Sequence, residues 1–110
     1  MIKQSINFRN FCNVNACLSY YANGNVCLKI YAGNMLLCEL SKDIGIQISK
    51  RVLILKDTLH TDQIINELMS AGLITAFQYN KKQGYVCNLS YKTYIEMQKE
   101  DSYILAATPM

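Results

Sequence analysis

The chain is poor in the residue types and segments that membrane, metal and catalytic sites require. Its 110 residues include no tryptophan, one proline and one histidine, His60. The apolar run at Arg51 to Leu55 is strand-sized, and no apolar stretch approaches the roughly 20 residues that a membrane-spanning helix needs. The first nine residues lack the unbroken apolar region of a signal peptide. We therefore expect a cytoplasmic protein with no membrane partner.

Charge of either sign is also scarce. Charged residues make up 17% of the chain, and the net charge is +3. Typical nucleic-acid-binding modules carry a denser stripe of basic residues than this chain does. The apolar share of 51% is ordinary for a globular protein. Because this length supports one core, we expect a single domain over residues 1–110, with a flexible tail over about 104–110.

Motifs for catalysis are missing. The sequence contains no GxSxG, no HExxH and no glycine-rich phosphate loop. His60 is the one plausible general base, and Asp57 and Asp62 lie near enough in sequence to pair with it. A single titrating residue makes no site, so we expect no catalytic residue, no enzyme activity and no cofactor.

The cysteines are too scattered for a zinc site. Their number is odd, none falls in a CxxC pair, and the single histidine stands far from all of them. Metal-binding and redox roles are the alternatives, but we expect buried free thiols in a reducing compartment and no metal site. The five are Cys12, Cys17, Cys27, Cys38 and Cys87.

The first half of the chain is typical of hairpins. Asn23-Gly24 is a strong hairpin turn, and it predicts paired strands at Asn15–Tyr21 and Val26–Tyr31. A second turn at residues 32–34 leads to a third strand, Met35–Leu40, which completes a meander. In the middle strand, one face is apolar throughout and the other is mixed, so we expect one well-buried face. The connector that follows, residues 41–49, contains a candidate short strand at 46–48.

The second half reads as a strand, a helix and a further hairpin. Residues 51–57 predict a buried strand, and residues 61–71 predict a helix that ends near Gly72. Asp57, Thr58 and Thr61 are its candidate N-caps, and Ile64, Ile65, Leu68 and Met69 form its apolar stripe. Strands over 75–79 and 85–91, a short helix over 92–100 and an extended segment at 104–105 complete the chain.

Together these elements predict an α+β domain. We expect a mostly antiparallel sheet of about five strands, with one principal helix packed on it and a short C-terminal helix. An alternative for residues 51–79 is a parallel βαβ unit, which the right-handed crossover rule permits.

Tyrosine is unusually frequent, with eight residues, and it has two competing uses. Its rings can cover a half-exposed sheet, or they can form a binding face for protein or nucleic acid. Tyr79 and Tyr85 flank Lys81 and Lys82 at one predicted hairpin, and we expect these four residues to contact a partner. In the nucleic-acid alternative, the same lysines act together with Lys50 and Arg51.

A meander leaves at least one open edge. The strands at 35–40 and 85–91 are apolar enough to pair with another chain, so homodimerisation through such an edge, or through the tyrosine-rich face, is a further hypothesis.

Four segments resemble a family of short proteins of unknown function carried by plasmids, phages and conjugative elements of gut bacteria. They are Tyr21-Ala-Asn-Gly-Asn-Val-Cys-Leu28, Val52-Leu-Ile-Leu-Lys-Asp57, Ile65-Asn-Glu-Leu-Met-Ser-Ala-Gly-Leu-Ile74 and Gly84-Tyr-Val-Cys87. The resemblance carries over no functional residue. It implies an accessory protein of a mobile element that binds a host protein, for example as an inhibitor of a defence system such as an anti-CRISPR protein.

Overall fold

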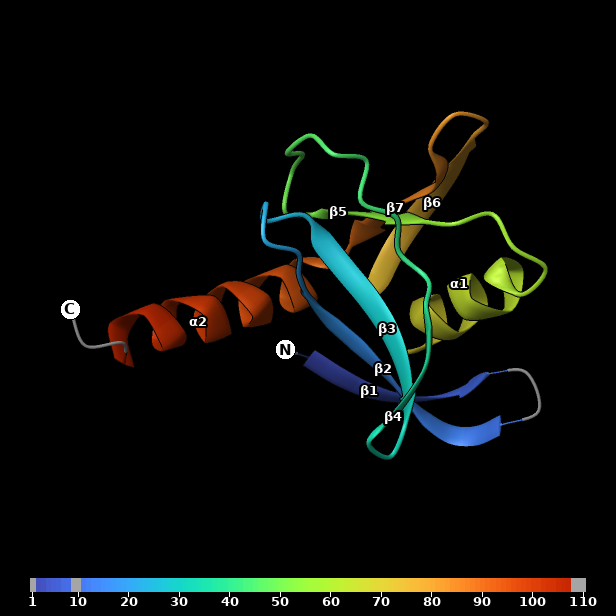
Figure 1. Cartoon of the computed structure of the whole chain (residues 1–110), viewed down its shortest axis with the longest axis horizontal. Helices are drawn as coiled ribbons and strands as arrows, with labels where there is room; N and C mark the ends of the chain where they lie inside the picture. The colour runs from blue at the N-terminus through green and yellow to red at the C-terminus, as the bar shows by residue number, and fades with distance from the viewer. Residues whose placement is uncertain (1, 9–10, 108–110) are drawn as a thin grey trace.

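The computed structural model describes residues 2–8 and 11–107, without the side chains of 11, 12 and 100–107; over these residues the chain forms seven strands and two helices (Figure 1). The elements are β1 (Ile2–Phe8), β2 (Phe11–Tyr20), β3 (Val26–Ala32), β4 (Met35–Glu39), β5 (Val52–Leu55), α1 (Thr61–Ser70), β6 (Ile74–Asn80), β7 (Gly84–Leu89) and α2 (Tyr91–Ala107). The predicted α+β class, antiparallel with a helix packed on sheet, is confirmed, but the strands form two sheets.

The first sheet has the order β1-β2-β3-β4, and all its neighbours are antiparallel. It contains the predicted meander as β2, β3 and β4. In β3, Val26, Leu28 and Ile30 are fully buried, whereas Lys29 and Tyr31 are half-buried on the other face. The expected difference between the two faces is confirmed.

Strand β1 was not predicted from the sequence. It pairs with β2 from Ile2 opposite Leu18 to Phe8 opposite Phe11, and thereby lengthens β2 beyond the predicted start. Only Ile6 and Phe8 of this segment are buried, so its sequence pattern did not indicate a strand. Its pairing partner, and not its own composition, makes it a strand.

The second sheet has the order β5-β7-β6, again antiparallel throughout. Since β5 and β6 both run opposite to β7, they run in the same direction, with α1 as the connection between them. The unit over residues 51–79 is therefore a split crossover, because β7 lies between its two parallel strands. The strand predicted at 85–91 consequently lies in the middle of a sheet and has no open edge.

Helix α1 packs its apolar side into the core and ends where the sequence predicts. Ile64, Ile65 and Leu68 are buried, but Met69 is 40% exposed and does not belong to the stripe. The Leu73 amide donates to the Leu68 carbonyl (2.9 Å), which closes the C-terminus through a Gly72 at φ +75°.

The start of α1 differs from the prediction. The N-cap is His60, whose side chain makes no capping bond. Thr61 instead secures the preceding loop: its hydroxyl donates to the Lys56 carbonyl (2.6 Å) and accepts from the Thr58 amide (2.9 Å).

Residues 40–42 join the two sheets. The Leu40 amide donates to the Leu28 carbonyl of β3 (2.9 Å), while the Lys42 amide donates to the Ile54 carbonyl of β5 (2.9 Å). Ser41 forms an isolated bridge with Leu55. One apolar cluster runs through both sheets, α1 and Met97 of α2. It includes Leu53 of the predicted buried strand, and Ile64 and Leu68 of the predicted apolar stripe.

The connector that follows contains no strand at residues 46–48. Asn25, which is 3% exposed, fixes it instead: its side chain donates to the Ile46 carbonyl (2.7 Å) and accepts from the Ile48 amide (2.9 Å). A buried amide side chain thus supplies the bonds that a neighbouring strand would have supplied.

The C-terminal segment is helical for longer than predicted. Helix α2 continues to Ala107 and leads away from the body of the molecule (Figure 1), so the extended segment expected at 104–105 is wrong. The part of the predicted flexible tail over 108–110 lies outside the described residues. Within residues 2–8 and 11–107, no helix has both the length and the apolar composition needed to cross a bilayer.

Candidate functional site

The β6–β7 hairpin carries all four residues predicted to contact a partner. Tyr79 and Tyr85 lie directly opposite each other on the two strands, with ring centroids 5.1 Å apart. Lys81 and Lys82 occupy the turn, where the Asn80 side chain accepts a bond from the Lys82 amide (2.8 Å). The structure therefore brings the four residues together on one continuous surface.

A glycine places this hairpin against the end of β5. Gly84 has φ +98°, and a Cβ atom added there would collide with the Leu55 carbonyl oxygen. This close approach brings the turn beside Lys56 and Asp57, which follow β5 directly. The result is an open cavity of about 320 Å³, which we call the lysine hollow. It is lined by Lys42, Lys56, Asp57, Tyr79, Lys81, Lys82, Gln83 and Gly84.

The lysine hollow concentrates positive charge. Four lysines and one aspartate give it a formal charge of +3, which equals the net charge of the whole chain. Two ammonium groups are oriented by backbone oxygens: Lys42 donates to the Lys82 carbonyl (3.5 Å), and Lys56 donates to the Glu39 carbonyl (3.3 Å). Within the described part of the chain, none of the four lysines forms an ion pair. The hollow therefore offers its positive charge to a ligand.

An aromatic row lies next to the hollow, made of Phe77, Tyr79 and Tyr85. The Phe77 and Tyr85 ring centroids are 6.2 Å apart, and Phe77 and Tyr79 are each about half exposed, at 48% and 49%. The Tyr79 hydroxyl donates to Asp57 (3.0 Å), and the Tyr85 hydroxyl donates to Asp62 of α1 (3.2 Å). These bonds fix the rings, so the row presents ring surface more than hydroxyl groups.

The pKa values of both tyrosines are raised. Asp57, as hydrogen-bond acceptor and nearby negative charge, raises the pKa of Tyr79. Loss of solvation raises the pKa of Tyr85, and the negative charge of Asp62 adds to it. Both side chains therefore remain neutral donors at physiological pH.

These two carboxylates are the ones that could have paired with His60. The structure assigns them to tyrosines, and the half-buried His60 ring packs edge-on against Phe8, with centroids 6.1 Å apart. Among the described residues, neither aspartate is hydrogen-bonded to His60.

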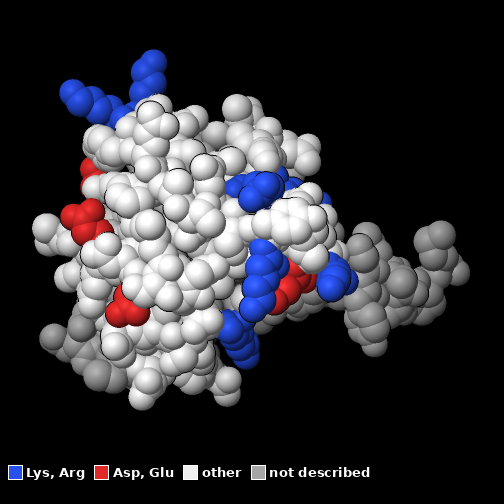
Figure 2. Space-filling view, turned by 180° about the vertical axis from the view of Figure 1, so that it is seen from behind, with Lys and Arg blue, Asp and Glu red and all other residues white. Residues whose placement is uncertain are grey.

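Lys50 and Arg51, the other residues of the nucleic-acid alternative, lie away from the hollow. They precede β5, whereas the hollow lies beyond its other end. Arg51 stacks between the rings of Tyr91 and Tyr94, at 5.8 and 5.7 Å. Figure 2 shows basic side chains projecting at the end of the hairpin and another basic group beside α2, with uncharged surface between them. On this face of the molecule the two groups do not form one continuous basic surface.

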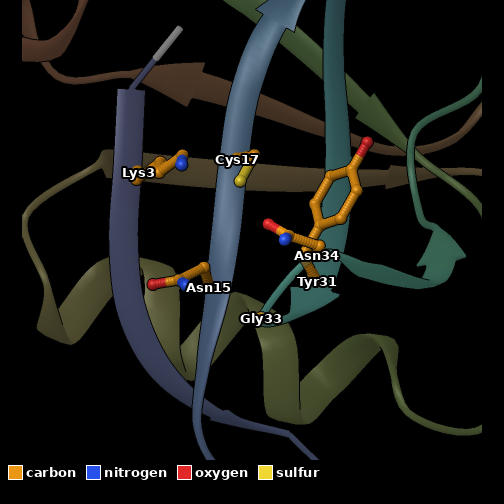
Figure 3. A pocket seen from close by; sticks show the side chains of 6 residues that line it. All are labelled: Lys3, Asn15, Cys17, Tyr31, Gly33 and Asn34. Atoms are coloured by element: carbon orange, nitrogen blue, oxygen red, sulfur yellow. The ribbon is translucent and has the colours of Figure 1, made fainter.

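A second hollow, of about 210 Å³, lies on the outer face of the first sheet. The strands β1, β2 and β3 form its floor, with Cys17 at the centre between Lys3 and Tyr31 (Figure 3). Burial raises the pKa of the Cys17 thiol, which the charge of Lys3 opposes, so the thiol is a poor nucleophile. With one cation and two asparagine amides, this hollow has little charge. Its lining is Lys3, Asn15, Cys17, Tyr31, Gly33 and Asn34.

The other cysteines behave as the sequence predicts where their side chains are described. Cys17, Cys27 and Cys87 are buried free thiols and Cys38 is half-buried, whereas the side chain of Cys12 lies outside the described residues. The described residues contain no cluster of three or more His, Cys, Asp or Glu side chains that could hold a metal ion.

Three charged members of the lysine hollow were not predicted from the sequence: Lys42, Lys56 and Asp57. Each is an ordinary surface residue by composition. The pairing of β5 with β7 brings Lys56 and Asp57 to the hairpin, and the bridge through residues 40–42 adds Lys42. The sequence contains one indication of these residues, because Lys56 and Asp57 lie at the end of a predicted strand.

Comparison of the chain with protein-family models, with curated proteins and with solved structures gave no match.

Proposed function

We propose that this chain is a non-enzymatic binding protein that holds an acidic surface of a protein partner in the lysine hollow. The observation that carries this proposal is the gathering of four lysines and one aspartate from three separate segments. The exposed aromatic row beside them is the kind of surface that anchors protein interfaces. The contact residues are then Tyr79, Lys81, Lys82 and Tyr85, supported by Lys42 and Lys56.

The family resemblance directs this proposal to a class of target. Small proteins of mobile elements commonly act by occupying a surface of a host protein. In this setting the partner is a host protein, and the most specific form of the proposal is inhibition of a defence system, as an anti-CRISPR protein does.

A regulator that binds nucleic acid is the second candidate, and the exposed rings of Phe77 and Tyr79 beside lysines favour it, because bases stack on such rings. Four phosphate contacts would give a logarithmic salt slope of about −3 on single strands. Because Arg51 lies away from the hollow, the basic residues do not form a long continuous surface for a nucleic-acid strand. For these reasons we place a protein partner first.

A pull-down from bacterial lysate tests both candidates, with half of each sample treated with nuclease. The variant Lys81→Glu/Lys82→Glu reverses two charges of the hollow, and Lys92→Glu/Lys99→Glu makes the same change on exposed positions of α2. We expect a stoichiometric protein that survives nuclease and binds the α2 control like the original chain. It should bind the hairpin variant at least about tenfold more weakly, since charge pairs at an interface set much of its specificity.

Two outcomes contradict the proposal. If the captured material is nucleic acid and disappears with nuclease, the second candidate replaces the first. If a protein is captured equally by both charge variants, and circular dichroism shows both to be folded, partner binding does not use the lysine hollow.

A further inference from the structure

The two sheets have four outer strands in the described part of the chain, and three of them are protected. The outer side of β5 is covered by residues 40–42, because the Lys42 amide donates to the Ile54 carbonyl and the Lys56 amide donates to the Leu40 carbonyl. The edge strand β1 lies against residues 71–73 and the start of α2, and it carries Lys3. The edge strand β4 is interrupted at Leu37, because Ile30 pairs with Cys38 and Tyr31 with Leu36, and it ends in Glu39. Covering segments, bulges and charges are the devices that keep edges from pairing with other chains.

The fourth outer strand, β6, lacks these protections over most of its length. Its irregularity falls at Thr75, which leaves Ala76–Asn80 in unbroken register with β7. These five residues are all exposed and include no charged side chain. No described segment pairs with their outer side. The hairpin stands away from the body there, so this edge is accessible (Figure 1).

We propose that β6 pairs with β6 of a second copy of this chain, antiparallel and about a two-fold axis at Gln78. A two-fold axis perpendicular to a pleated sheet has to pass through a residue position, because opposite residues share a face. Gln78 is the central residue of the five, so this register uses the whole unbroken stretch. It sets Phe77 opposite Tyr79 of the second copy, twice, and aromatic cross-strand pairs stabilise sheets.

Charge supports a second copy as the occupant. In this register Lys81 lies opposite Thr75 of the second copy, and Lys82 lies opposite Ile74, so no like charges meet. The two Lys81 residues are then about 20 Å apart, six residues along the pair. Both aromatic rows fall on one face, between the two lysine hollows. The dimer does not depend on the proposed function, but it would give that function a two-site surface.

Disulfide trapping combined with sedimentation tests this register. Opposite residues in antiparallel strands have Cα atoms about 4.5 to 5.5 Å apart, a distance that a disulfide accepts. We expect the exposed variant Gln78→Cys to form a covalent dimer under mild oxidation. The control Asn88→Cys, exposed on the same sheet face but one strand inward, should match the background of the unaltered chain. The mass of the unaltered chain should rise with concentration between about 10 and 500 µM, since an edge pairing buries less than a standard interface.

A charge swap at the axis supplies a second, independent readout. Gln78→Lys alone and Gln78→Glu alone should each weaken self-association by about fivefold at low salt, because identical charges then lie opposite each other. Mixing the two variants should restore it. A chain that stays monomeric at every concentration overturns the proposal and leaves the edge to a segment of another protein. Equal trapping of Gln78→Cys and Asn88→Cys also overturns it.

Discussion

At the scale of the residue, Gly84 determines how closely the hairpin approaches β5. Its positive φ costs any other residue about 1–2 kcal/mol, and a Cβ atom would also strike the backbone of Leu55. We expect Gly84→Ala to lower the free energy of unfolding by about 2–4 kcal/mol, as measured by urea denaturation. Gly33→Ala is the matched control, because Gly33 has φ +60° and open space around it. Equal losses in the two variants would show that the contact with Leu55 has no effect on stability.

The thiol of Cys87 makes stability depend on pH in the alkaline range. Burial raises the pKa of Cys87 to about 12, from an ordinary value of 9.0. Above pH 9 the unfolded chain loses this proton while the folded chain keeps it. Stability is therefore complete below pH 9 and falls as the pH rises toward 12, by up to about 4 kcal/mol for this group.

Urea unfolding at pH 7, 9 and 10 checks this prediction. Cys87→Ala should be less stable at pH 7, because it loses a buried side chain, but it should lose less stability between pH 9 and 10. Cys27→Ala, which removes another buried thiol, serves for comparison. The same pH slope in Cys87→Ala and the original chain would mean that Cys87 ionises normally in the fold.

At the scale of the element, one buried hydroxyl holds residues 40–42 against the first sheet. Ser41 is fully buried, and its oxygen accepts a bond from the Leu28 amide (2.8 Å) and lies 2.7 Å from the Tyr21 hydroxyl. Ser41→Ala leaves that amide buried without its partner. We expect a loss of about 1–3 kcal/mol in the free energy of unfolding.

The control for this substitution is Ser70→Ala, at the exposed end of α1, which should change stability by less than about 0.5 kcal/mol. Both values come from equilibrium unfolding monitored by circular dichroism. A Ser41→Ala chain as stable as the control would show that water or a shift of the segment satisfies the Leu28 amide.

At the scale of the whole molecule, local features were predictable and long-range pairings were not. The turn at Asn23-Gly24 and the helix end at Gly72 follow from the backbone preferences of those residues, so the meander and α1 were found. Strand β1 has too few buried residues for its own pattern to reveal it. The insertion of β7 between β5 and β6 depends on which strands meet in space, and no local pattern records that.

The residues of the candidate site also fall into a group set by local sequence and a group set by long-range pairing. Tyr79, Lys81, Lys82 and Tyr85 are close in sequence, so one hairpin was enough to group them. Lys42 and Lys56 join them only through the pairing of distant segments. The sequence thus groups the hairpin residues, but it does not indicate the charged residues that other segments add to the hollow.

The segment 40–42 also has a consequence for how the molecule opens. Its amides and carbonyls belong to both sheets at once, so neither sheet can melt without removing hydrogen-bond partners from the other. Unfolding is then one cooperative event. The backbone amides of Lys42 and Lys56, two lysines exposed on the outside of the protein, donate to the Ile54 and Leu40 carbonyls at this junction. We therefore expect the backbone that carries these two lysines of the hollow to stay ordered for as long as the two sheets remain joined.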